Sequence, residues 1–336
     1  MNIDLKKTLS SKTIDVPPSM RFTYPTRLAN AGTASIMQIY MPGHKVNKPE
    51  LKISIRPDST QSLEIKPKKK YHPKRLYKIL YKKITPLIQM EDEYIFDARY
   101  DVDGNMAHIL TNVVPALLAA KEIVPQITVI LRSKACSMAI NAYKLLGFDV
   151  LCTDRDVQGN LILATCPKGN MYAGWYSCIF GKLTLESINK PTPERVFLSR
   201  KGSRSIINEH EVEGLLKEYG FEKVYYEDLP IIEQWSIAKN ATVVVGIHGA
   251  ALASLVFNRN SVKLVELFHP GYVTGKYRLT TSAIGGKWCG VTGQIPEKEN
   301  IVRELDYKQN FRRLALSPTR IDINSLRMAL EYLKVE

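Results

Sequence analysis

Short apolar runs alternate with stretches of helical periodicity along most of the chain beyond residue 90. Apolar strands separated by helices of about 10 to 15 residues are typical of βαβ units, whose right-handed crossovers form parallel sheets with helices on both faces. The sequence therefore predicts an α/β fold. The expected strands are residues 94–97, 127–131, 148–151, 195–199, 223–226, 242–246 and 263–267, and the expected helices are residues 109–123, 135–146, 208–219, 231–239, 250–257 and 321–334.

The alternation falls into two series, as expected for a chain of 336 residues at about 100 to 200 residues per domain. The first series occupies residues 91–185, the second occupies residues 186–316, and a closing helix lies in residues 317–336. Residues 1–90 precede both series and are expected to be part of the first domain or appended to it. We therefore predict two domains with a boundary within residues 170–193.

The formal net charge of +14 is concentrated in one segment, because residues 1–90 hold 18 Lys and Arg residues against 5 Asp and Glu residues. Its densest part runs from Lys66 to Lys83 and interleaves nine basic residues with Tyr, Leu and Ile. Such a run suits either a helix that lies on an anionic membrane surface or a solvated linker. A nucleic-acid partner is not expected, since the charge is confined to this segment and no nucleic-acid-binding motif is present.

The lengths of the apolar runs and the spacing of the cysteines indicate the cellular compartment of the protein. No apolar run approaches the roughly 18 residues of a membrane-spanning helix, and residues 1–12 lack the apolar core of a signal peptide, so we expect a cytoplasmic protein. The cysteines are widely spaced, with no C-x-x-C pair, so we expect reduced structural thiols. They are Cys136, Cys152, Cys166, Cys178 and Cys289.

The stretch VVVGIHGAALASLVF, residues 243–257, predicts a strand, a tight turn and a helix in immediate succession. Gly246 and Gly249 let a ligand approach the backbone, and His248 offers an imidazole. The backbone N–H groups at the start of the helix, from Ala250 onward, face the carboxyl edge of the sheet, where α/β proteins bind phosphorylated ligands. The other interpretation is a purely structural turn.

A basic loop follows the expected strand 195–199. Arg200, Lys201 and Arg204 lie within five positions of each other, and arginine forks with a lysine point charge suit the two anionic centres of a diphosphate. A solvated basic loop is the alternative. Because this loop and the glycine turn both follow strands of one domain, they are expected at the same sheet edge.

These segments resemble glycosyltransferase family 61. Its members carry an (I/L)-S-R-x-x-x-x-R loop, and the corresponding loop here is LSRKGSR, with three residues between its arginines in place of four. The family's G-x-H-G-A-G-L-x-N-x-x-F segment corresponds to GIHGAALASLVF, and its V-x-E-L strand to LVEL at residues 264–267, where Leu264 takes the place of the valine. A weaker upstream match aligns the family's N-x-x-H-W-helix with Asn105 and His108. This chain departs from the family at Ala251 for Gly, Asn260-Ser261 for Pro-Gly, Ile109 for Trp and Asn112 for an acidic residue.

The resemblance implies a GT-B fold, in which two Rossmann-like domains face a cleft, and an inverting transfer of GlcNAc, xylose or arabinose from a UDP-linked donor. The donor would lie on the C-terminal domain and a glycan or lipid-linked acceptor on the N-terminal one. Bacterial relatives act in capsule and surface-polysaccharide pathways. From the basic run Lys66 to Lys83 and the absence of a spanning helix, we expect a peripheral place on the inner face of the plasma membrane. A catalytically inert scaffold or nucleotide-binding protein of the same assembly is the alternative function.

Inverting transfer requires a base for the acceptor hydroxyl and positive charge for the leaving diphosphate. His108, Asp103 and Asp101 are the candidate bases, while the resemblance makes Asn105 and Asn112 candidates for acceptor binding. Glu266 is expected either to accept a hydrogen bond from a ribose hydroxyl or to cap a neighbouring helix. We predict no metal or other cofactor, because the D-x-D match at residues 101–103 lies away from the diphosphate loops.

Overall fold

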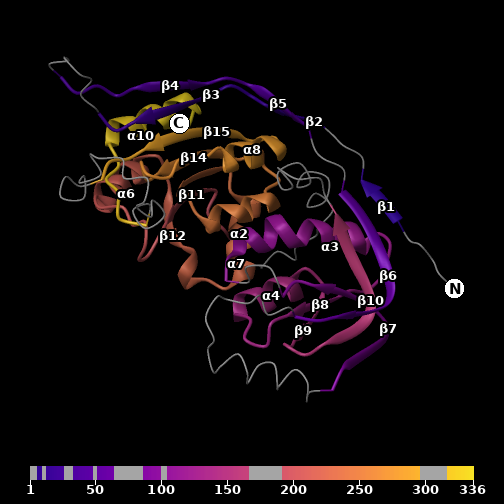
Figure 1. Ribbon diagram of the computed structural model, residues 1–336. Coiled ribbons are helices and arrows are strands. Elements are labelled where there is room, and N and C mark those ends of the chain that lie inside the picture. The colour runs from indigo at the N-terminus through magenta and orange to yellow at the C-terminus, as the bar shows by residue number, and fades with distance from the viewer. Residues whose placement is uncertain are drawn as a thin grey trace, which may run out of the picture. The chain divides into compact units, whose positions relative to one another are not determined.

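The computed structural model describes residues 6–9, 13–25, 33–47, 51–63, 86–99, 104–165, 191–295 and 316–336. The chain forms two compact units, each with its own sheet (Figure 1). Unit 1 comprises Met1–Ser11 and Pro49–Tyr172, and unit 2 comprises Lys12–Lys48 and Ala173–Glu336. The first 90 residues, expected as a single segment, therefore supply strands to both units. The basic run from Lys66 to Lys83 lies outside the described residues.

The sheet of unit 1 has a parallel half and an antiparallel half. Strands β10, β7, β8 and β9 run parallel, as the βαβ pattern predicts, whereas β6 pairs antiparallel with both β10 and β1. The strand order is β1(Lys6–Leu9), β6(Leu51–Gln61), β10(Val157–Thr165), β7(Ile88–Asp97), β8(Thr128–Leu131) and β9(Asp149–Cys152). All four residues of β8 are buried, as expected for a central strand.

The helix expected over residues 109–123 is interrupted. It consists of the short turn α2(Met106–His108), the π-helical turn η1(Ile109–Val113) and α3(Val114–Lys121). Pro115 stands in the first turn of α3, and a proline has no N–H for the preceding turn, so the hydrogen-bond ladder changes register there. The other helix of unit 1 within the described ranges is α4(Ser137–Leu145).

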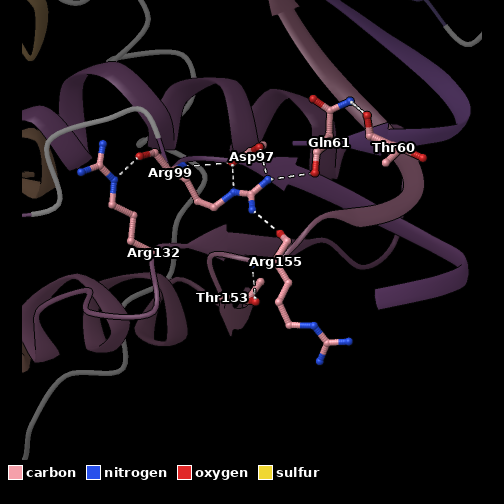
Figure 2. A network of polar contacts seen from close by, with 7 residues as sticks. All are labelled: Thr60, Gln61, Asp97, Arg99, Arg132, Thr153 and Arg155. Carbon is pink, nitrogen blue, oxygen red and sulfur yellow. Dashed lines mark hydrogen bonds and ion pairs between the residues drawn. The ribbon is translucent and has the colours of Figure 1, made fainter. Parts of the chain in front are cut away.

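A buried arginine closes the carboxyl edge of this sheet (Figure 2). Arg99, two residues after β7, is 1 % exposed and forms a two-pronged ion pair with Asp97, at 2.9 and 2.7 Å. Its guanidinium also donates to the backbone oxygens of Gln61 and Arg155, at 3.2 and 2.6 Å. Arg99 thereby ties the ends of β7 and β6 to the loop before β10.

The sheet of unit 2 is parallel except at one edge. Strands β11 to β15 and β3 run parallel, and β4 pairs antiparallel with β3, so the N-terminal chain completes the C-terminal sheet. The strand order is β12(Glu222–Tyr225), β11(Arg195–Ser199), β13(Val243–Ile247), β14(Lys263–Phe268), β15(Lys287–Thr292), β3(Ser19–Thr23) and β4(Gln38–Met41). A separate antiparallel pair joins β2(Thr13–Val16) to β5(His44–Asn47).

Helices of unit 2 bury the expected apolar faces. The side chain of Asp322 caps α10 by accepting from Ser325 N, and Leu326 and Leu330 of this helix pack in one core cluster with Phe197 and Val245. The helical elements are α6(Glu209–Glu218), the 3₁₀ turn η3(Tyr226–Asp228), α7(Ile231–Asn240), the 3₁₀ helix η4(Ala250–Phe257), α8(Lys276–Ala283) and α10(Ile323–Tyr332). In neither unit do the described ranges contain a helix with the length and apolar character needed to cross a bilayer.

Candidate active site

Two glycines shape the turn after β13. A Cβ on Gly246 would lie 3.2 Å from the Leu198 Cβ of β11 and 3.0 Å from the Leu252 Cδ2 of η4. A Cβ on Gly249 would lie 2.8 Å from Arg200 Nη1. The missing side chains therefore let β11, η4 and the arginine approach the backbone.

The helix expected after this turn is a 3₁₀ helix, η4, and not an α-helix. Gly249 precedes it in an extended conformation, and Ala250 is its first residue. The first N–H groups of a helix have no acceptor within that helix, so they remain available to an anion. The predicted role of Ala250 therefore rests on its backbone.

His248 is fixed by a buried carboxylate. Its Nδ1 lies 2.5 Å from Glu266 Oε1, and Trp288 Nε1 donates to Glu266 Oε2 at 2.7 Å. Glu266 is 0 % exposed, and burial raises the pKa of its carboxyl although the contacts with His248 and Trp288 oppose the shift. An ionised Glu266 only accepts hydrogen bonds, so Nδ1 carries the proton and Nε2 is left as the free nitrogen of the ring.

Three aromatic rings surround the imidazole of His248. Phe268 stacks on it, and the centroids of Tyr272 and Tyr277 lie 5.1 and 5.3 Å from its own. The Tyr277 hydroxyl donates to the Gly249 carbonyl oxygen at 2.6 Å, and burial raises the pKa of that hydroxyl. Tyr277 thus fixes the backbone at the glycine that Arg200 approaches.

The three predicted cations of the β11 loop have different surroundings. Arg204 donates from Nη1 to the His248 carbonyl oxygen at 3.0 Å, and its guanidinium lies over the ring of Tyr272. Arg200 lies against Gly249 and has no hydrogen bond or ion pair with any residue that the structure describes. Lys201 is exposed and pairs with Asp228 of η3 at 2.6 Å.

Unit 2 therefore brings most of the predicted donor residues together. Arg200 and Arg204 meet the His248–Gly249 turn, and Glu266 supports that turn from β14. Two positive charges beside free backbone N–H groups can hold a diphosphate. Trp288, Tyr272 and Tyr277 were not predicted as part of the site, because neither β15 nor α8 was predicted. The sequence feature that could have indicated this part of the site is the tryptophan in the apolar run KWCGVT.

The predicted residues of unit 1 form a second, separate cluster. Asn105 caps α2 by accepting from Ala107 N at 2.9 Å. One turn later, the amide of Asn112 lies 3.1 Å from His108 Nδ1. The Thr111 side-chain oxygen lies 2.8 Å from the same amide. His108 is half-buried, and its Nε2 has no hydrogen-bond partner within the ranges described.

The carboxylates proposed as alternative bases, Asp101 and Asp103, lie outside the described residues. Within the described ranges, no three His, Cys, Asp or Glu side chains are grouped as a metal site would require. Cys136, Cys152 and Cys289 are free thiols, and Cys166 and Cys178 are not described.

The chain is thus an α/β protein in which the carboxyl edge of a mainly parallel sheet carries a glycine–histidine turn and two arginines. Residues 106–265 match the family model described as Glycosyltransferase 61. At the position where the family has a glycine, Ser261 adopts a φ of 51°, the left-handed region that glycine enters freely.

One curated relative is the EGF domain-specific O-linked N-acetylglucosamine transferase of Drosophila melanogaster. It is 29 % identical over 115 residues, which are 32 % of this chain and 22 % of the relative. The chain thus spans about a fifth of the length of that relative.

Two solved structures were also found. One is the dodecameric iron-containing heptosyltransferase TibC in complex with ADP-D-β-D-heptose, with 11 % identity, a TM-score of 0.35 and coverage of 74 % of this chain and 77 % of that chain. The other is TibC from enterotoxigenic E. coli H10407, with 10 % identity, a TM-score of 0.37 and coverage of 98 % and 93 %. TM-scores in this range do not establish a shared fold.

Proposed function

We propose that the protein is a glycosyltransferase that transfers a sugar from a nucleoside-diphosphate donor, with a UDP-sugar favoured. The observation that carries this proposal is the approach of Arg200 and Arg204 to the His248–Gly249 turn, inside the segment that matches the Glycosyltransferase 61 family model. The resemblance to this family further supports a fold of the GT-B type.

Donor binding is assigned to unit 2. Arg200, Arg204 and the first N–H groups of η4 neutralise the diphosphate, and Lys201 joins them when it leaves Asp228. His248, oriented by Glu266, presents Nε2 to a phosphate or hydroxyl oxygen. Because protein cations take the charge of the leaving group, we propose that turnover needs no metal ion.

Catalysis is assigned to unit 1. The acceptor hydroxyl attacks the anomeric carbon of the sugar from the face opposite the diphosphate, so the configuration inverts. As the new C–O bond forms, the bond from the anomeric carbon to the diphosphate breaks, and His108 Nε2 takes the hydroxyl proton. Asp103 or Asp101 is the alternative base, and Asn105 and Asn112 would contact the acceptor.

The acceptor is proposed to be a glycan or a lipid-linked glycan of polysaccharide biosynthesis, such as a capsule. The run from Lys66 to Lys83 would bring the enzyme to an anionic membrane surface on the cytoplasmic side. The name of the fly relative makes GlcNAc the first sugar to test as the donor group.

The test is a binding panel of UDP, GDP, CMP and ADP read by thermal shift, followed by a hydrolysis or transfer assay with UDP-GlcNAc, with and without EDTA. Selective stabilisation by one diphosphate, about 2 to 3 kcal/mol at a hundredfold excess over Kd, supports the donor site. Turnover that survives EDTA supports a metal-free mechanism, and loss restored by Mn²⁺ contradicts it. Diphosphate binding without turnover of any sugar donor would favour the inert scaffold.

A further inference from the structure

We propose that Thr111 and Asn112 select the tautomer of His108 that leaves Nε2 free to accept a proton. The proposal rests on the assignment of His108 as the base, and it deepens that assignment by naming two positioning residues. All three side chains belong to one continuous stretch of unit 1, at the junction of α2 and η1.

The Thr111 hydroxyl has a single hydrogen for two contacts. Its oxygen lies 2.5 Å from the backbone oxygen of Ala107 and 2.8 Å from the oxygen-bearing end of the Asn112 amide. A hydroxyl donates one hydrogen, and neither a carbonyl nor an amide oxygen can donate one in return. One of these two contacts would therefore place two acceptors together without a hydrogen between them.

Turning the Asn112 amide by 180° about its last bond removes this conflict, because its oxygen and nitrogen exchange places at nearly the same positions. The Thr111 hydroxyl then donates to the Ala107 oxygen and accepts from Asn112 Nδ2. Asn112 Oδ1 now faces His108 Nδ1, 3.1 Å from the amide in the structure, and must receive a hydrogen from it. Every polar atom of the chain of contacts is satisfied in this arrangement only.

The consequence concerns the base. A neutral imidazole carries one ring hydrogen, so a hydrogen on Nδ1 leaves the lone pair on Nε2. When Nε2 takes a proton, the Nδ1–H bond to Asn112 remains and steadies the imidazolium. Thr111 is 3 % exposed and bonded to the backbone of the same turn, so it is well placed to hold the amide in this orientation.

The π turn η1 sets the relative positions of Thr111, Asn112 and His108. The last turn before Pro115 widens at η1, and the Thr111 hydroxyl returns to the Ala107 oxygen four residues earlier. Single π turns inside helices often occur at functional sites. Here the turn places a threonine, an asparagine and a histidine within one chain of hydrogen bonds.

The experiment reads the tautomer directly. Long-range ¹H–¹⁵N correlation spectra of the full chain, labelled at the histidine rings and recorded where the ring is neutral, distinguish a hydrogen on Nδ1 from one on Nε2, and His108→Ala assigns the signal. We expect the Nδ1–H tautomer in the unmodified protein. A His108 ring with its hydrogen on Nε2 would overturn the proposal.

Two variants test the role of Thr111. Thr111→Val removes the hydroxyl at nearly constant volume, so the amide is released, and the Nε2–H form should become populated with kcat lowered about tenfold or more. Thr111→Ser keeps the hydroxyl and should keep both the tautomer and kcat. An unchanged tautomer in Thr111→Val would contradict the selection mechanism.

Asn112→Asp provides the rescue. A carboxylate can only accept, so His108 should keep its hydrogen on Nδ1 whether or not Thr111 is present, and Thr111→Val should no longer change the spectrum in this background. If the protein proves to have no transferase activity, the spectra still test the tautomer, so failure of the function and failure of this inference are distinguishable.

Discussion

Two arginines follow strands of the two sheets at equivalent places, yet their surroundings are opposite. Arg99 comes two residues after β7, is 1 % exposed, and its guanidinium has partners on three segments of unit 1 (Figure 2). Arg200 comes directly after β11, is half-buried, and has no polar partner among the residues described. One arginine therefore serves the fold, and the other is available to a ligand.

The cause of the difference is local. Asp97 stands two residues before Arg99 and accepts from both its Nε and Nη2 groups. Arg200 follows Ser199, whose hydroxyl donates to Glu209 of α6, and no carboxylate of the described residues forms an ion pair with this arginine. A basic residue at a sheet edge thus indicates a ligand site only when its neighbours do not already neutralise it.

Arg99→Ala should have the largest effect, and that effect should be on stability. It leaves the nearly buried carboxylate of Asp97 without its counter-ion, which typically costs about 3 to 5 kcal/mol in the free energy of unfolding. Chemical denaturation followed by far-UV circular dichroism would measure it. Arg155→Ala is the matched control, because Arg99 uses only the backbone oxygen of Arg155; a loss below about 1 kcal/mol for Arg99→Ala would show that the pair is dispensable.

Arg200→Ala should have the opposite profile. We expect the free energy of unfolding to change by less than about 0.5 kcal/mol, since the change removes no hydrogen bond or ion pair of Arg200 with the described residues. Nucleoside-diphosphate affinity should fall about 10- to 150-fold, which corresponds to a charge-assisted hydrogen bond of about 1.5 to 3 kcal/mol. Titration calorimetry with UDP measures this, and equal affinity in both proteins would remove Arg200 from the donor site.

Gly249→Ala should have a smaller effect that depends on Arg200. The added Cβ would meet Arg200 Nη1 at 2.8 Å, and the flexible arginine would move away, because the extended backbone itself tolerates alanine. We expect UDP affinity to fall by less than in Arg200→Ala. The two changes should not be additive, so the double variant should bind like Arg200→Ala. Additive losses would mean that Gly249 acts by direct approach to the ligand and not through the arginine.

The sequence predicted seven parallel strands but missed the parallel strand β15 and every strand that has an antiparallel partner. All seven expected strands are present within about one residue of their predicted ends, except that β7 begins earlier. Continuous apolar runs identify buried parallel strands, whereas β10 contains Gly159 and Asn160, which suggest a turn but form an irregularity in its pairing with β6. Strands β3 and β4 were missed because nothing local shows that the N-terminal chain joins the second sheet.

The candidate site was predictable where it depends on short motifs. Arg200, Arg204, His248 and Gly249 are within two loops of one sheet, and the order of the strands brings the loops together. Trp288 reaches Glu266 across the β14–β15 pair, which requires knowledge of the strand order. The hydrogen bonds of Asn112 with Thr111 and His108 form at a π turn, and the helical periodicity of the sequence does not reveal such a turn.

Substitution of Lys201 should have the smallest effect on UDP affinity. Changes at Lys201 and its partner Asp228 distinguish a lysine that binds the donor from one that only forms a surface ion pair. In the structure the ammonium pairs with Asp228 and lies over the ring of Tyr225, and the hydrogen bond that the ammonium donates to Asp228 raises the pKa of the lysine. Because both charges are exposed, Lys201→Ala should leave stability unchanged within error and lower UDP affinity by about threefold at most.

Asp228→Asn is the informative partner of that variant. If Lys201 contributes to donor binding, it must first leave Asp228, so removing the carboxylate should free the lysine and raise UDP affinity. The gain should disappear in the Asp228→Asn, Lys201→Ala double variant and should weaken with added salt, as expected for an exposed charge. If Asp228→Asn lowers affinity or leaves it unchanged, Lys201 belongs to the surface ion pair, and Arg200 and Arg204 are the cations of the loop that act on the donor.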